Sequence, residues 1–300
     1  MTANTLPSQK IDLQITLKEG TFGETGTNTV YLSGLRVSAD IAKAGGISLN
    51  ESLIRIWGLT PSMMNELSTM GLIVGTQGRS TLILYAYAEN GVKSIAFSGD
   101  VFESWAEYQG APVVTMNLKA QSGQIANIKP TAAISYKGAV DVADIMAQLA
   151  ASMGLKFERN GVSVMLTNPN LPGTDRQKAV AAADAARINC LIDDDVLAIW
   201  PKNGARQQQP GDIITLSADT GLVGYPAYNA MGIAVKCLYN PAIRFGTYIK
   251  VQSALPQANK TWYVYQLAHN LESELPGGQW FSSLLLTEGP SGYNDQAAAS

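Results

Sequence analysis

The stretch between residues 216 and 287 constrains the fold most, because it holds four runs of strand-forming residues separated by turn-forming ones. The runs are 233–239, 247–251, 261–271 and 280–287, rich in Val, Ile, Leu, Thr, Tyr or Trp. Leu275-Pro276-Gly277-Gly278 has the residues of a tight turn, since Pro fixes φ and Gly tolerates positive φ. Both faces of the third run are apolar at its start, so that strand should be covered on both sides there. The stretch therefore predicts a small antiparallel barrel or sandwich.

A glycine-rich motif in the same stretch resembles a known family. The motif consists, in order, of Leu216-Ser217, Thr220-Gly221-Leu222-Val223-Gly224, Pro226, Leu238-Tyr239-Asn240-Pro241 and Gly246. This order is similar to that of the baseplate hub proteins of tailed phages, of the late-control-D type, which are related to the base of type VI secretion spikes. The resemblance covers residues 130–287, and the N-terminal third fits it in outline. It implies a barrel, then a small helix–strand insert, then a second barrel.

Residues 1–130 have a nearly all-β pattern with one helix. Strand patterns occur at 11–17, 29–39, 52–57, 72–74, 81–88, 92–97, 101–108 and 113–119. Gly34 predicts a bulge in the second of these strands. Thr60 and Pro61 predict the start of a short helix that Gly71 ends. The apolar face of this helix would either dock on a core or form a methionine-rich binding groove, and it holds Met63, Met64, Leu67 and Met70.

Residues 131–211 change to a mixed helix and strand pattern. Asp141 predicts the N-cap of a helix that Gly154 ends, and Thr174 with Gln177 predicts a capping box at the start of an alanine-rich helix. Strands are predicted at 155–157 and 163–166 around a turn at 159–161, and at 190–192 and 196–200 around the three aspartates 193–195. Residues 201–211 have the composition of a linker or long turn.

These patterns predict a mainly β fold class with an α+β insert. We expect a first barrel over residues 1–130, a helix–strand insert over 131–211, a second barrel over 212–290 and a flexible tail over 291–300. By the resemblance, the two small antiparallel β-barrels would be tail-tube-like domains. A weak similarity between residues 102–119 and 271–287 fits either a duplicated barrel or a chance likeness of two hairpins.

The amino-acid composition of the chain limits the kinds of molecule that it can bind. Charged residues make up 15% of the chain, below the roughly 25% of an average soluble domain, which indicates either a neutral polar surface or extensive burial against other proteins. Lys and Arg are spread singly and the net charge is −3, so we expect no nucleic-acid-binding surface. The resemblance implies DNA only as cargo through the channel. No run approaches the ~18 apolar residues of a membrane span, and no signal peptide is recognisable, so we expect assembly in the host cytoplasm. Cys190 and Cys237 are expected to be reduced thiols.

No catalytic, cofactor or metal site is predicted, and no cofactor. His269 is the only histidine, and the GxSxG, HExxH and CxxC motifs are absent, so His269 is interpreted as a packed strand residue. The aspartates 193–195 are adjacent rather than alternately spaced as in a calcium loop, which favours a turn. Residues 75–80 lack the lysine of a phosphate-binding loop and are interpreted as a hairpin loop. No spacing places any two of the candidate glycosidase carboxylates as a pair, namely Glu103, Glu107, Glu272 and Glu274.

The leading hypothesis, carried by the resemblance, is a structural virion protein without enzymatic activity. It would be a homotrimeric baseplate hub at the distal end of a phage tail tube, adapting the sixfold tube to a threefold spike and enclosing the central channel. Expected partners are the tail tube or distal tail protein, the spike, other baseplate proteins and the tape-measure protein. One alternative is a carbohydrate-binding or wall-degrading tail accessory with Tyr225, Tyr228, Trp262 and Trp280 in a groove. Another is the equivalent hub part of a bacterial contractile injection machine.

Overall fold

The chain divides into two compact units, each built from separate segments. The structure is a computed structural model that describes residues 8–45, 48–68, 80–89, 91–208 and 212–289. The first unit comprises Met1–Ala42, Glu51–Ser122 and His269–Phe281, and the second comprises Lys43–Asn50, Gly123–Ala268 and Ser282–Ser300. The predicted strand at 72–74 and the predicted tail at 291–300 lie outside the described residues. The division into three domains at 130 and 211 stays a prediction.

The first unit is built on an antiparallel sheet with the strand order β3-β4-β7-β6-β5-β1-β2. The strands are β1 (Gln9–Thr16), β2 (Thr29–Leu32), β3 (Val37–Ala44), β4 (Glu51–Trp57), β5 (Thr81–Ala88), β6 (Ser94–Glu107) and β7 (Thr115–Gln121). The end of β19 (Thr261–Ser273) lies beside β3, and there the Asn270 amide donates to Asp40 at 2.8 Å. The mainly β fold class predicted from the sequence is confirmed.

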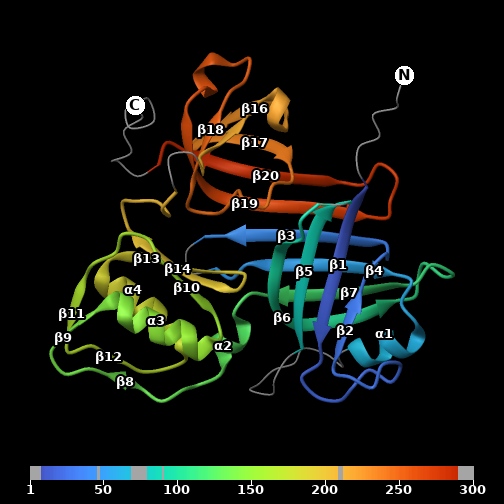
Figure 1. The fold of residues 1–300 in the computed structure, drawn as a ribbon, viewed down its shortest axis with the longest axis horizontal. Helices are drawn as coiled ribbons and strands as arrows, with labels where there is room; N and C mark the ends of the chain where they lie inside the picture. The colour runs from blue at the N-terminus through green and yellow to red at the C-terminus, as the bar shows by residue number, and fades with distance from the viewer. Residues whose placement is uncertain (1–7, 46–47, 69–79, 90, 209–211, 290–300) are drawn as a thin grey trace. The chain divides into compact units, whose positions relative to one another are not determined.

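Strand β6 makes this sheet bend. It is 14 residues long, and its first half pairs with β5 while its second half pairs with β7. Register shifts occur between Val101 and Glu103 on one side and between Leu84 and Tyr85 on the other. Such irregularities bend strands, and in Figure 1 the arrows of β1 and β5 run across those of β4 and β7. The prediction of separate strands at 92–97 and 101–108 was wrong, because pairing with β5 keeps Ser98 and Gly99 extended.

Two local features of the first unit differ from the prediction. The expected strand at 29–39 is two strands, because Gly34 takes a φ of 68° and the chain turns there, so β2 pairs with β1 and β3 with β4. Helix α1 (Pro61–Leu67) begins as predicted, with the Thr60 hydroxyl accepting from the Met63 N–H. It ends at Leu67 rather than near residue 71. Met64 and Leu67 are buried, so this helix docks on a core; Met70 lies outside the described residues.

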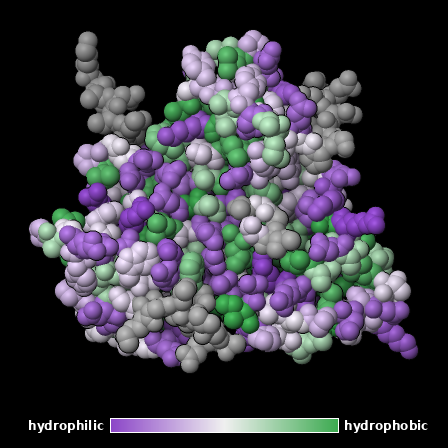
Figure 2. Space-filling model, turned by 180° about the vertical axis from the view of Figure 1, so that it is seen from behind, coloured by the Kyte–Doolittle hydropathy of each residue, from purple (hydrophilic) through white to green (hydrophobic). Residues whose placement is uncertain are grey.

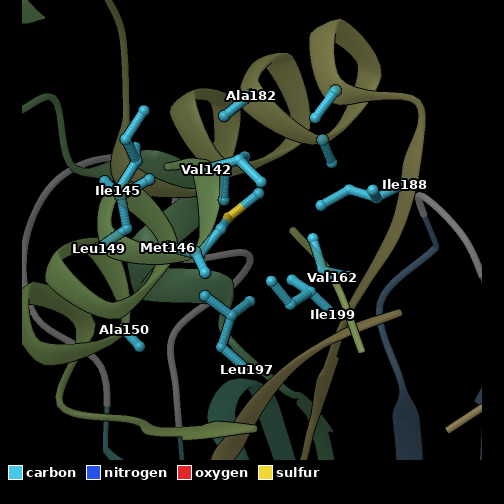
Figure 3. Close-up of a cluster of buried hydrophobic side chains, with 14 of the residues drawn as sticks. Val142, Ile145, Met146, Leu149, Ala150, Val162, Ala182, Ile188, Leu197 and Ile199 are labelled. Atoms are coloured by element: carbon cyan, nitrogen blue, oxygen red, sulfur yellow. The ribbon is translucent and has the colours of Figure 1, made fainter. Parts of the chain in front are cut away.

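The middle of the chain forms a two-helix layer on a three-stranded sheet within the second unit. Helix α3 (Val142–Met153) has Asp141 as N-cap and Gly154 as C-cap, and α4 (Asp175–Ala186) has the Thr174–Gln177 capping box, as predicted. The sheet order is β10 (Lys156–Arg159), β14 (Val196–Pro201) and β13 (Ile188–Asp193). Figure 3 shows that apolar side chains of both helices and of β14 point toward one another in a common core, among them Met146, Leu149, Ala182 and Leu197. Shorter elements complete this part: α2 (Gln124–Ile128), β8 (Ile134–Ser135), β9 (Ala139–Asp141), β11 (Met165–Thr167) and β12 (Asn170–Leu171).

The predicted hairpin around residues 159–161 does not form. Strand β10 pairs in parallel with β14, with Phe157 opposite Leu197, whereas β11 pairs with β9. Asn160 has its backbone N–H and its side-chain amide bonded to the Ile199 carbonyl, each at 3.0 Å. These long-range bonds outweigh the local turn preference of the Asn-Gly pair.

The C-terminal sheet of the second unit has the order β16-β17-β20-β19, with β18 pairing with both β19 and β15. Its strands are β15 (Ile214–Leu216), β16 (Leu222–Asn229), β17 (Gly232–Leu238), β18 (Tyr248–Val251), β19 and β20 (Trp280–Thr287), with short 3-10 turns at Ala218–Thr220 and Pro256–Ala258. Trp262, Tyr263 and Val264 are all buried, so the start of β19 is covered on both sides, as predicted. Closure of either sheet into a barrel stays a prediction.

Candidate functional site

A buried ion network in the second unit is centred on Asp193. The aspartates lie at the β13–β14 turn, as predicted: Asp193 pairs with Val196, and Asp194 takes a left-handed φ of 55°. Asp193, however, points inward and is only 6% exposed. An ionised carboxylate at such a depth requires charged partners, because its loss of hydration is otherwise several kcal/mol.

Two cations reach Asp193: Lys43 lies 150 residues away along the chain and Arg206 lies 13 residues away. The Lys43 ammonium lies 3.2 Å from Asp193 Oδ1 and 2.6 Å from Asp194 Oδ2. The Arg206 guanidinium donates through Nη1 to Asp193 Oδ2 at 2.8 Å. Through Nε and Nη2, Arg206 also holds both oxygens of Glu158 at 2.9 and 2.8 Å, a two-pronged geometry that suits a planar guanidinium. The half-exposed Arg244 adds a contact of 3.1 Å to Glu158.

The charges of the network hold Asp193, Glu158 and Lys43 in their ionised forms. Burial by itself would raise the pKa of Asp193, but the positive charges of Lys43 and Arg206 hold that pKa well below its usual range. Burial would likewise raise the pKa of Glu158, and the hydrogen bonds and charge of Arg206 lower it to about 2. Burial by itself would lower the pKa of Lys43, but the negative charges of Asp193 and Asp194 raise it above its usual value. The network therefore suits a fixed cross-link rather than proton transfer.

The network also anchors the segment that the sequence indicates as a linker. Beside the Arg206 side chain, the backbone N–H of Arg206 donates to the Gly246 carbonyl at 2.8 Å. Gln207 N–H donates to Asn160 Oδ1 at 2.9 Å, and the Gln208 side chain exchanges two hydrogen bonds with the backbone of Tyr248. Residues 206–208 are thus bonded on one side to Asn160, next to β10, and on the other to Gly246 and to Tyr248, the first residue of β18.

The candidate catalytic residues from the sequence do not assemble into a site. His269 is 2% exposed on β19, as expected of a packed strand residue. Each glutamate has its own partner: Glu103 pairs with Lys119 and Glu274 with Lys10, while Glu107 and Glu272 accept backbone N–H bonds from Gln109 and Gln279. Within the described residues, no group of three or more His, Cys, Asp or Glu side chains could hold a metal ion. Residues 75–79 lie outside the described part of the chain.

Among the helices that the structure describes, none is long and apolar enough to span a membrane.

Cys190 and Cys237 are free thiols in the structure. Burial raises the pKa of both to about 12. We expect both thiols to titrate after denaturation without reductant, and both to react slowly in the native protein at pH 8, because the thiolate fraction is about a thousandfold below that of an ordinary cysteine. Ellman titration and native alkylation followed by mass spectrometry check this. Fewer than two thiols in the denatured protein would contradict it.

A second feature is the β16–β17 hairpin, residues 222–238, which concentrates exposed apolar side chains. Single apolar side chains among polar ones are ordinary on a protein surface, and Figure 2 shows such mixing on the face it presents. In contrast, this hairpin carries five of the ten large apolar side chains that are exposed among the described residues: Val223, Tyr225, Tyr228, Met231 and Leu238. Trp262 and Trp280, which the carbohydrate alternative needs on the surface, are 3% and 9% exposed.

A groove runs over the face of this sheet opposite its core. In β17 the buried Ile233, Val235 and Cys237 alternate with more exposed residues, and β20 alternates in the same way. The groove is lined by small or uncharged side chains for the most part, including Val223, Tyr225, Ala227, Ala234, Gln266 and Ser283. The two tyrosines of this hairpin were predicted as candidates for a carbohydrate groove, whereas β16 was not predicted as a strand.

Comparison with known proteins finds one matching family and several solved structures of similar fold. The family model for baseplate hub gp41 matches residues 13–275. The tail protein from Neisseria meningitidis MC58 is similar in fold, with a TM-score of 0.63 at 10% identity over 93% of this chain and 96% of that chain. The 43 kDa tail protein of prophage MuSo2 from Shewanella oneidensis has a TM-score of 0.60 at 8% identity, over 93% of this chain and 97% of that chain. The E. coli c3393 protein, a component of the type VI secretion system, has a TM-score of 0.51 at 10% identity, over 87% of this chain and 75% of that chain. No curated protein sequence matches the chain.

The fold is similar to that of the two phage tail proteins named above. The chain belongs to the baseplate hub gp41 family. It is a structural component of the tail baseplate of a bacteriophage virion.

Proposed function

We propose that this chain is the hub at the distal end of the tail tube, where three copies surround the central channel and join a sixfold tube to a threefold spike. The observation that carries the proposal is the baseplate hub family match over residues 13–275. Closed rings satisfy every head-to-tail contact and remain finite, which suits a component of fixed copy number. We infer that the tube or distal tail protein, the spike, neighbouring baseplate proteins and the tape-measure protein are its partners, and that it has no catalytic step.

The ion network supports a mechanical role. A hub under load during injection needs segments that do not slide, and Arg206 bonds two parts of the second unit to one side chain. The Arg206 network is paired throughout and mostly buried, so solvent ions screen it less than they would a surface pair. The fold similarity to a type VI secretion component favours, as a second candidate, the equivalent hub of a bacterial contractile injection machine.

We expect imaging of the particle that contains this chain to show three copies around the tail axis at the distal end of the tube. Subunit contacts should bury more than the ~1,600 Å² of a standard interface, because each copy must contact both neighbours. Reconstruction of intact particles without imposed symmetry at the tail tip is the measurement. Six copies, or a position outside the central channel, would refute the proposal.

A further inference from the structure

We propose that the β16–β17 hairpin is the surface through which one copy of this chain packs against a second copy. The inference rests on the proposed ring of copies and goes further by assigning the contact to named side chains. The exposed fractions are 73% for Tyr225, 53% for Tyr228 and 62% for Met231. Tyr and Met are enriched in protein–protein interfaces, and exposed tyrosines next to small residues make effective anchors.

The scarcity of charged residues on and around the β16–β17 hairpin indicates what kind of partner it binds. Lys236 is the only charged residue between Leu222 and Leu238, and the neighbouring stretches 261–268 and 282–287 have none. Interfaces between identical subunits are more apolar than those of separable partners, and charged residues are depleted from interface cores. A highly charged partner would bury charges against this face without counter-charges, which costs free energy. A second copy of this chain, in which charged residues are only 15%, is a matching neutral partner.

The contact is made by the side chains of the hairpin rather than by addition of a strand to its edge. Strand β16 lies at the end of the sheet order, but its pairing with β17 is irregular between Val223 and Ala227. Within this interval Gly224 has a φ of 70°, and Pro226 has no N–H to donate. A bulge and a proline are the features that protect an edge strand from pairing with another chain.

The hairpin is also held in place before any partner binds. Gly232, at the start of β17, approaches the β20 backbone so closely that a Cβ there would lie 2.1 Å from the Leu286 carbonyl oxygen. This close approach fixes the hairpin against β20. A surface fixed in advance loses less conformational entropy on association.

Site-specific photo-cross-linking tests the inference. A benzoylphenylalanine replaces Met231, and the matched control replaces Met165 of β11, whose exposure of 60% nearly equals the 62% of Met231. Particles of the encoding phage that carry either variant are irradiated, and adducts are identified by mass spectrometry. We expect an adduct of two copies of this chain from position 231 and a much weaker one from position 165.

The outcomes separate the inference from the proposed function. If position 231 captures a different virion protein, or nothing, in particles whose tail tip contains the chain, the inference fails and the hub proposal stands. If the chain is missing from the tail tip, the hub proposal fails and the inference falls with it. As a second variant, the double substitution Tyr225→Asp with Tyr228→Asp should raise the dissociation constant between copies of this chain about 30-fold or more, as expected for interface anchors. The double substitution Tyr225→Phe with Tyr228→Phe should retain most of the affinity between copies. Equal affinities of the two double variants would overturn the inference.

Discussion

Replacing Arg206 with Met is expected to lower the free energy of unfolding of this protein by about 3–5 kcal/mol, the usual cost of removing one partner from a buried charge pair. Arg206 is 2% exposed and is the shared partner of Asp193 and Glu158. Without it, Lys43 is the one counter-charge that the described residues leave to Asp193, and the Phe245 carbonyl loses its hydrogen bond from Nη1. Urea unfolding measures the total effect, and hydrogen exchange of the β13 and β14 amides measures it locally.

Two further variants make this expectation specific. Arg244→Met removes a cation that also contacts Glu158, but the Arg244 side chain is 41% exposed, so the loss should stay below about 1 kcal/mol. The triple variant Arg206→Met, Asp193→Asn, Glu158→Gln removes the uncompensated charges and should recover much of the loss. An equal effect of the Arg206 and Arg244 substitutions, or a loss below about 1 kcal/mol for Arg206→Met, would show that the network does not stabilise the fold.

Leu149→Ala should lower the free energy of unfolding by about 3–5 kcal/mol, because it leaves a cavity in the core between α3, α4 and the three-stranded sheet. Leu149 is fully buried, and Figure 3 shows its side chain within the cluster that contains Met146 and Leu197. The helices have few alternative contacts with which to fill the gap, since α4 contributes mainly alanines to this core. Denaturant unfolding, with far-ultraviolet circular dichroism as the signal, measures the change.

Controls for this prediction come from the same part of the chain. Met165→Ala on β11 removes a side chain that is 60% exposed, and its effect should stay within about 0.5 kcal/mol. Leu149→Met keeps most of the volume and should cost less than about 1.5 kcal/mol. If Leu149→Ala proved no more harmful than Met165→Ala, the core between α3, α4 and the three-stranded sheet would not be close-packed around Leu149.

Local signals in the sequence were sufficient for several elements. The caps Thr60, Asp141 and Thr174 define helix starts because each side chain bonds a backbone N–H two or three residues away. The strand runs at 261–271 and 280–287 and the aspartate turn are equally local, and the structure places all of them close to where they were predicted. The glycine-rich motif between 216 and 246 also indicated the baseplate hub family correctly.

Tertiary structure alone decided the features on which the proposals depend. Asp193 meets Lys43, which is 150 residues away in sequence, and Arg206, which is 13 residues away, only because the fold brings the three side chains together. A turn aspartate that faces solvent has the same local sequence pattern. Pairing with β14 overrode the Asn160-Gly161 turn signal, and pairing with β5 kept Ser98-Gly99 extended, because long-range hydrogen bonds outweigh a local preference of about 1 kcal/mol. Likewise, which tyrosines and tryptophans are exposed depends on which face of each strand the core covers. Composition fixes how many apolar residues there are, and only packing decides that Trp262 is buried while Tyr225 remains exposed.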